Sequence, residues 1–232
     1  MSEVRDDLAS RLAAVRARIA NACVRAGRDP HSVQLLAASK FQSVDAIRAA
    51  YALGQREFGE NYVQELAQKA TQLADLTDLR WHLIGRLQTN KVKDLLRIGC
   101  SLQALDSIKL CEALAARAEQ TRPGGGQVDV FVQVNSSDEP QKAGVTESQI
   151  APLMAAIRHQ PRLRLRGLMS IPRPSDDEAV MRQAFRRVRE LVDHYQLAEC
   201  SMGMSDDLEI AIEEGSTMVR VGTAIFGERA AR

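Results

Sequence analysis

The stretch LLAASKFQSVDAI, residues 35–47, sets a lysine at the mouth of an apolar strand. The run from Leu35 to Ala38 reads as a buried strand, because a short uncharged apolar run is typical of a strand covered on both faces. Lys40 follows at its end, one residue after Ser39. The fold depends on whether the chain repeats this strand, and the function depends on what the ammonium group does there.

The strand repeats along the whole chain, with helical segments such as 61–75 and 177–195 in between. The eight β-type runs are VQLLAAS (33–39), REFGE (56–60), LRWHLIG (79–85), SLQALDS (101–107), VDVFVQVN (128–135), LRLRGLMSI (163–171), AECSMGM (198–204) and TMVRVGT (217–223). Strict alternation indicates parallel strands joined by right-handed crossovers. Eight such units predict an α/β fold, a (β/α)8 TIM-type barrel. An open doubly wound sheet has the same periodicity, but no G-x-G-x-x-G follows the first strand.

An extra helix precedes the barrel, at about residues 4–26. Its apolar residues are spaced by three or four positions, as on one helical face: Val4, Leu8, Leu12, Val15 and Ile19. Gly27 and Pro30 end it. The loop RPGGGQ (122–127) precedes a strand, so we interpret it as a helix-to-strand connector. No linker separates two domains, and residues 1–232 are expected to form one barrel domain.

Composition argues against several classes of partner. Lys and Arg number 31 and Asp and Glu number 30, so no nucleic acid and no anionic membrane is expected as a partner. No apolar run reaches the ~20 residues of a membrane span, and the first residues have no signal-peptide pattern. The cysteines are scattered, as expected for reduced thiols in a cytoplasmic protein: Cys23, Cys100, Cys111 and Cys200. The histidines have no metal-ligand spacing, so no metal site is expected.

The ends of the last two strands suggest a phosphate site. Barrel enzymes carry their chemistry at the carboxyl ends of the strands, and the loops after strands seven and eight often hold phosphate. Gly222 and Thr223 offer backbone N–H groups and a hydroxyl, and AIFG (224–227) can begin a short helix. Asp206 and Asp207 would repel an anion, so we place it on the Gly222–Thr223 side. A role of Gly222 in shaping the turn alone remains the alternative.

Lys40 has two interpretations. A lone lysine at a barrel rim usually extends to water. In an enclosed site its pKa falls, and the neutral amine can attack a carbonyl to form a Schiff base. Together with a phosphate site, the second interpretation predicts a ligand that carries an aldehyde and a phosphate. Pyridoxal 5'-phosphate (PLP) and a sugar-phosphate aldolase substrate both fit, and the residues alone do not separate them.

Five ordered blocks decide between these ligands by resemblance. They are SK (39–40), FGENYVQE (58–65), WHLIGRLQTNK (81–91), RGLMSIP (166–172) and SMGMSDDLEIAIEEGSTMVRVGTAIFG (201–227). They closely resemble the pyridoxal phosphate homeostasis proteins, the YggS/PROSC-like family, over nearly the whole chain. The resemblance implies a barrel like the N-terminal domain of alanine racemase, with PLP held as a Schiff base on Lys40.

The resemblance also implies the remaining cofactor contacts. Arg220 would face the pyridine nitrogen, and the phosphate would lie on Ser201, Gly222 and Thr223. Asn61 and His82 match motif positions of the family and are expected to face the ring. Each of these two has a plainer interpretation: an Asn that opens a helix is usually a cap, and a His inside a strand is usually a satisfied core residue.

The function implied by the resemblance is that of a PLP-binding protein. It would buffer or deliver the cofactor, affect amino-acid and keto-acid balance, and contact apo-enzymes that require PLP. The alternative is a PLP-dependent amino-acid racemase, and a weaker third is a Schiff-base aldolase without cofactor. We expect no catalytic residues and negligible turnover, because Arg220 would keep the ring nitrogen unprotonated and the ring a weak electron sink.

A racemase also needs a second base on the face opposite the lysine. In the related racemases this base is a tyrosine from an additional β domain, and this sequence ends at Arg232 without such a domain. Its three tyrosines, Tyr51, Tyr62 and Tyr195, are expected in helices outside the mouth. The chain also departs from its relatives around the mouth, at Phe41–Ser43, at Arg86 and at Gln141–Lys142. Accessory lysines and entrance chemistry are therefore not carried over.

Overall fold

The computed structural model describes residues 2–121, 126–136 and 143–227, with the side chains of residues 2–6 left aside. Part of the predicted loop at 122–127, the pair Gln141–Lys142 and the side chain of Val4 therefore lie outside the described residues. Within them, no helix is long and apolar enough to cross a membrane. The four cysteines are buried and free, as the sequence predicts.

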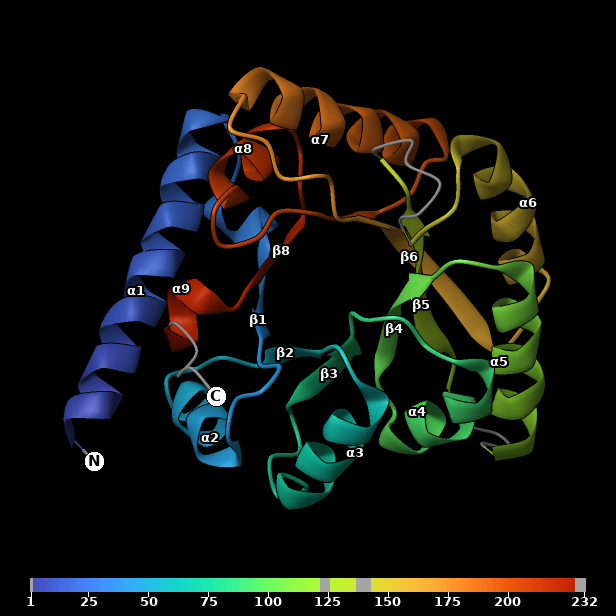
Figure 1. Cartoon of the computed structure of the whole chain (residues 1–232), viewed down its shortest axis with the longest axis horizontal. Coiled ribbons are helices and arrows are strands. Elements are labelled where there is room, and N and C mark those ends of the chain that lie inside the picture. The colour runs from blue at the N-terminus through green and yellow to red at the C-terminus, as the bar shows by residue number, and fades with distance from the viewer. Residues whose placement is uncertain (1, 122–125, 137–142, 228–232) are drawn as a thin grey trace.

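The predicted barrel is confirmed: eight parallel strands pair in chain order, and β1 pairs with β8 to close the ring (Figure 1). The strands are β1 Gln34–Ala38, β2 Glu57–Glu60, β3 Arg80–Leu83, β4 Ser101–Leu105, β5 Val128–Val134, β6 Leu163–Ser170, β7 Glu199–Ser201 and β8 Met218–Val221. Each lies inside one of the predicted β-type runs. The alternative of an open sheet is excluded by the closed ring.

Helices follow the strands and form the outer layer of the barrel (Figure 1). They are α1 Ser2–Arg25, α2 Val44–Ala52, α3 Val63–Gln72, α4 Val92–Ile98, α5 Ile108–Thr121, α6 Glu147–Arg158, α7 Glu178–His194, α8 Leu208–Glu213 and α9 Thr223–Phe226. Short 3-10 turns, Pro30–Ser32 and Thr89–Lys91, precede β1 and α4. The predicted helical stretches at 61–75 and 177–195 correspond to α3 and α7.

Strand β8 shows how the strands divide their side chains between two sides. Val219 and Val221 belong to the apolar cluster that α1 covers on the outside. Met218 belongs to the other cluster, and the neighbouring inward position is taken by Arg220. Successive side chains of a strand point to opposite faces, so this alternation follows from the extended backbone. It brings a guanidinium into the interior of the barrel.

Helix α1 lies across the outside of the two loops that follow β7 and β8. Arg11 Nε donates a hydrogen bond of 2.9 Å to the carbonyl of Ile225 in α9. Arg18 donates to the carbonyl of Ser205 at 2.8 Å and pairs with Glu209 of α8 at 2.6 Å. These contacts fasten the extra helix to the loops from which the sequence predicts a phosphate site.

Candidate functional site

A cavity of about 390 Å³ opens at the carboxyl ends of the strands, and we call it the mouth cavity. Lys40 lines it just after β1, Asn61 after β2, and Arg220 at the end of β8. Gly222 and Thr223 line it on the β8 side. The other lining residues are Ala38, Gln42, Ile84, Gly85, Arg86, Gln133, Ala143, Ile171, Met204, Ser205, Asp206 and Gly227. The structure therefore brings together five of the seven predicted site residues.

The turn that carries Lys40 is held on both sides of the lysine. On one side, the hydroxyl of the buried Ser39 donates to Glu60 Oε1 at 2.6 Å. On the other, the backbone N–H of Phe41 donates to Glu65 Oε1 at 2.7 Å. Phe41 has a φ of +64°, in the left-handed region that non-glycine residues rarely adopt. A backbone held in such a conformation points to a position fixed by its surroundings.

The cluster that holds this turn is centred on Lys69 of α3, which the sequence analysis missed. Its ammonium donates to the carbonyl of Ser39 at 2.8 Å, to Glu60 Oε1 at 2.8 Å and to Glu65 Oε1 at 2.7 Å. All three donors of the ammonium are thus used. Burial outweighs the hydrogen bonds from Lys69 and Ser39 and raises the pKa of Glu60. Its second oxygen is buried and accepts no hydrogen bond from a described residue.

Arg220 is fixed by oxygen acceptors instead of by a carboxylate. Its Nη1 donates to the carbonyl and the hydroxyl of Ser201, at 2.7 and 2.8 Å, and its Nη2 donates to the carbonyl of Ser170 at 2.8 Å. Burial lowers the pKa of Arg220 to about 10, against the opposing charge of Asp207. The guanidinium therefore stays cationic at neutral pH. No described carboxylate forms an ion pair with it.

The phosphate side predicted from the sequence lies at the same mouth. Thr223 is exposed to the cavity at the start of α9. Gly222 packs closely against β1, since a Cβ there would lie 3.1 Å from the carbonyl oxygen of Ala38. Ser205 adds a hydroxyl to the lining and accepts a 3.4 Å hydrogen bond from the N–H of Ala224.

Ser201 does not line the cavity. It is fully buried beneath Arg220, and its hydroxyl donates to Gln103 Oε1 at 2.8 Å. The position of Ser201 therefore does not support a direct contact to a phosphate at the mouth. Its observed role is to hold the guanidinium of Arg220. The alternative interpretation of Asn61 as a helix cap is not found, because the cap position of α3 is occupied by Tyr62.

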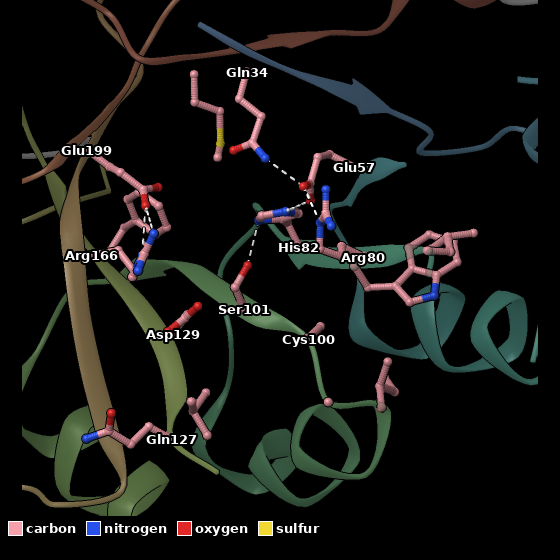
Figure 2. A pocket seen from close by; sticks show the side chains of 17 residues that line it. Gln34, Glu57, Arg80, His82, Cys100, Ser101, Gln127, Asp129, Arg166 and Glu199 are labelled. Carbon is pink, nitrogen blue, oxygen red and sulfur yellow. Dashed lines mark hydrogen bonds and ion pairs between the residues drawn. The ribbon is translucent and has the colours of Figure 1, made fainter. Parts of the chain in front are cut away.

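His82 lies at the opposite end of the barrel, so its expected place beside the cofactor ring needs correction. It lines a cavity of about 370 Å³ at the amino ends of the strands, the lower cavity, together with Glu57, Ser101 and Arg166 (Figure 2). Its Nε2 contacts Glu57 Oε2 at 2.7 Å and its Nδ1 contacts Ser101 Oγ at 2.6 Å. Ile84, two residues further along the chain and just past the end of β3, lines the mouth cavity instead.

The three tyrosines do not line the mouth cavity, although Tyr62 lies near its edge, with its ring centroid 6.1 Å from that of Phe41. Tyr51 is in α2, where its ring is covered by the guanidinium of Arg56. Tyr62 and Tyr195 directly flank α3 and α7. None of them is among the described residues that line the mouth cavity. Of the departures from the family pattern, Gln42 and Arg86 do line it.

Comparison with known proteins gives a consistent result. The family described as "Alanine racemase, N-terminal domain" matches residues 10–230. The curated relatives include the pyridoxal phosphate homeostasis proteins of Pseudomonas aeruginosa, 45% identical over 96% of both chains, and of Escherichia coli strain K12, 42% identical over 97% of both.

Solved structures agree with this match. A protein from Bifidobacterium adolescentis superposes with a TM-score of 0.91 at 35% identity, over 97% of each chain. PipY of Synechococcus elongatus, solved with PLP bound, gives 0.81 at 37% identity, over 95% of this chain and all of that one. The alanine racemase of Corynebacterium glutamicum gives 0.68 at 18% identity, with 62% of that chain covered, which shows a shared fold.

Proposed function

We infer the function from the premise that this chain belongs to the alanine racemase N-terminal domain family and, within it, to the pyridoxal phosphate homeostasis proteins. We propose that it binds PLP in the mouth cavity and buffers or delivers the cofactor. The supply of PLP to enzymes that interconvert amino acids and keto acids would then depend on it.

The observation that carries this proposal is the meeting of three chemical groups in one cavity. PLP brings an aldehyde that condenses with amines, a pyridine nitrogen and a phosphate. Lys40 offers a primary amine, Arg220 a cationic donor, and Gly222 and Thr223 a close backbone and a hydroxyl. A volume of about 390 Å³ lies in the range of small-molecule sites, roughly 300–1,000 Å³. The residues present therefore fit the cofactor.

Each residue has a separate task in this proposal. Lys40 holds the aldehyde end, and the Ser39–Phe41 turn fixes where its side chain starts. Arg220 donates a hydrogen bond toward the ring nitrogen and keeps its own proton, since its pKa remains about 10. Thr223 and the backbone N–H groups beside Gly222 bind the phosphate. Asn61 completes the wall next to the ring.

The same arrangement favours storage of the cofactor over catalysis. An arginine that retains its proton leaves the ring nitrogen without one and makes the ring a weak electron sink. The described residues bring no tyrosine to the mouth as a second base. We therefore propose binding with negligible turnover, with transient contact between the protein and the apo-enzymes that take up its PLP.

The visible spectrum of the purified protein with added PLP tests the binding site. We expect an imine absorption band that is lost in Lys40→Ala. Borohydride should reduce the imine to a stable amine and leave the pyridoxyl group on the peptide that contains Lys40. Lys93→Ala is the matched control, because Lys93 is exposed on α4. An imine band in Lys40→Ala, with a pyridoxyl label that stays on the protein after borohydride reduction and denaturation, would move the anchor to another lysine. A wild-type protein that takes up no PLP would refute the proposed function.

The racemase alternative rests on the shared fold of the alanine racemases. It is tested by deuterium exchange at Cα and by D/L interconversion of alanine and other amino acids at saturating PLP. Interconversion at about 1 per second or faster, the rate of an ordinary enzyme, would replace the binding-protein proposal with a racemase.

Delivery is tested by the rate at which the loaded protein activates an apo-aminotransferase. We expect a rate above that of PLP release into buffer. Activation no faster than release would leave a buffering role and exclude direct contact.

A further inference from the structure

A chain of hydrogen bonds crosses the interior of the barrel from the lower cavity to the mouth cavity. Glu57 Oε2 contacts His82 Nε2 at 2.7 Å, and His82 Nδ1 contacts Gln103 Nε2 at 3.1 Å. Gln103 Oε1 accepts from the hydroxyl of Ser201 at 2.8 Å, and that hydroxyl accepts from Arg220 at 2.8 Å. The five side chains come from β2, β3, β4, β7 and β8. We call them the interior chain.

The interior chain is buried and therefore needs its hydrogen bonds. Each of its residues is at most 8% exposed, and Gln103 and Ser201 are fully buried. A buried polar group that loses its partner costs roughly 1–3 kcal/mol. Five polar side chains in the interior of a barrel are thus kept there by one another, and each fixes the orientation of the next.

The direction of every bond in the interior chain is set by Arg220. A guanidinium only donates, so Ser201 Oγ accepts from Arg220 and gives its own proton to Gln103 Oε1. The amide nitrogen of Gln103 is then turned toward His82 Nδ1, which accepts. The proton of His82 consequently lies on Nε2 and is donated to Glu57. All four bonds have one consistent orientation.

We propose that Gln103 is a positioning residue for Arg220, and that the interior chain couples the lower cavity to the cofactor ring. This rests on the proposed function, in which Arg220 faces the pyridine nitrogen. Gln103 touches neither the mouth cavity nor the cofactor, and it acts through the hydroxyl of Ser201. Without its amide oxygen, that hydroxyl loses its acceptor and is free to rotate away from Arg220.

The far end of the interior chain is open to the lower cavity, where Figure 2 shows Glu57 and His82 side by side. Glu57 Oε1 also accepts from Gln34 Nε2 at 2.6 Å and from Arg80. Ser101 Oγ lies 2.6 Å from His82 Nδ1 and shares it with Gln103. Along the interior chain, a change at this end reaches Arg220 through the amide of Gln103, which makes that residue the place to interrupt the coupling.

The test is Gln103→Met, which keeps the approximate volume of the side chain and removes its hydrogen bonds to Ser201, His82 and Met218 Sδ. We expect roughly three- to tenfold weaker binding of PLP, as for the loss of one buried hydrogen bond, together with a shift of the visible band. Gln55→Met is the matched control, because Gln55 is also buried and bonds only to backbone carbonyls, those of Leu35 and Glu57. The control should lose stability without moving the band.

A graded series sharpens the result, with Ser201→Ala expected to have a larger effect than Gln103→Met, and His82→Phe a smaller one. A role that is only structural would lower stability in all variants and leave the band in place, which would overturn the proposal. The crystal structure of the cofactor-free Gln103→Met variant is the second measurement. We expect the Arg220 guanidinium to leave Ser201 Oγ, and an unchanged guanidinium would refute the positioning role even where PLP binding itself fails. If Gln103→Met does not fold, Gln103→Leu, which also lacks the amide, replaces it in both measurements.

Discussion

The mouth cavity and the lower cavity are similar in size, about 390 and 370 Å³, but their charged groups are held differently. In the lower cavity the arginines are ion-paired: Arg80 with Glu57, and Arg166 with Glu199. At the mouth, the exposed Arg86 is paired with Asp106 at 3.7 Å, whereas the buried Arg220 donates to carbonyl and hydroxyl oxygens and forms no ion pair with a described carboxylate. A ligand of the lower cavity would have to displace protein carboxylates, whereas the cation at the mouth is available to a ligand.

Volume alone therefore does not identify a binding site. Two glutamates on the same strand show the underlying difference. Glu57, at the lower end of β2, receives hydrogen bonds from His82 and Arg80, and these outweigh burial and lower its pKa. At the upper end of β2, burial prevails and raises the pKa of Glu60. The partners of the carboxylate thus outweigh its burial at the lower end of β2, and burial outweighs the partners at the upper end, beside Lys40.

The largest expected difference between the two ends is in stability. Lys69→Met should cost about 3–5 kcal/mol, because it leaves Glu60 buried without its cation, and their side chains are 7% and 0% exposed. Arg166→Met should cost about 0–1 kcal/mol, since the Arg166–Glu199 pair is partly exposed. Urea unfolding midpoints measure both. Equal losses would show that the two ends are not built on different principles.

The next largest difference concerns cofactor affinity. Arg220→Met removes a charged hydrogen bond to the ring, worth roughly 1.5–3 kcal/mol, so PLP should bind about 10- to 150-fold more weakly. Arg166→Met, the matched arginine of the lower cavity, should leave the affinity unchanged. Titration of the imine band gives both constants. If PLP affinity fell as much in Arg166→Met as in Arg220→Met, a cofactor contact would have to lie in the lower cavity, which would contradict the proposed site.

Removal of one hydroxyl at each end should give a smaller effect. Thr223→Ala should weaken PLP binding about tenfold, by loss of a hydrogen bond to the charged phosphate, and should leave binding of pyridoxal unchanged. Ser101→Ala, at the lower cavity, should alter neither. The comparison of PLP with pyridoxal is decisive, because equal affinities in the wild type would refute the phosphate site itself.

The smallest effect is a difference in pH dependence between the two glutamates. The lowered pKa of Glu57 stabilises the fold above the ordinary value of about 4.5, and this stabilisation is lost as the pH falls through the folded pKa. The raised pKa of Glu60 has the opposite sign: its contribution is full below about 4.5 and is lost as the pH rises through the folded pKa.

Unfolding curves at a series of pH values measure this difference. The stability gap between wild type and Glu57→Gln should grow as the pH rises through the range just below 4.5. The free energy of unfolding of the wild type, relative to that of Glu60→Gln, should fall as the pH rises above that range. Slopes of the same sign for both variants would contradict the different environments at the two ends of β2.

The sequence predicts the barrel because eight short apolar runs leave few other ways to bury parallel strands. Lys40, Arg220, Gly222 and Thr223 could be placed at the mouth for the same reason, since each follows or ends a strand. The sequence does not show how far along the barrel axis an inward-pointing residue lies. His82 in β3 and Ile84, just past the end of that strand, are two residues apart and line opposite cavities.

Lys69 shows a second limit of prediction. In the sequence it stands four residues after Glu65 in a helix, the spacing of ordinary exposed helical pairs. Only the packing of α3 against the end of β1 reveals that its ammonium is buried and bonded to Ser39. Gln103 is hidden in the same way, because its partners Ser201 and His82 come from strands that are distant in the sequence.

The fastening of α1 to the loops of the mouth has a consequence for the order in which the protein is made. Arg11 and its acceptor Ile225 are 214 positions apart, so a ribosome adding about 5–20 residues per second needs about 10–40 s between them. During that time the apolar stripe of α1, with Leu8 and Leu12, lacks the partners it finds in β8 and α9. The helix can therefore complete its packing only after the strand that closes the barrel has been synthesised.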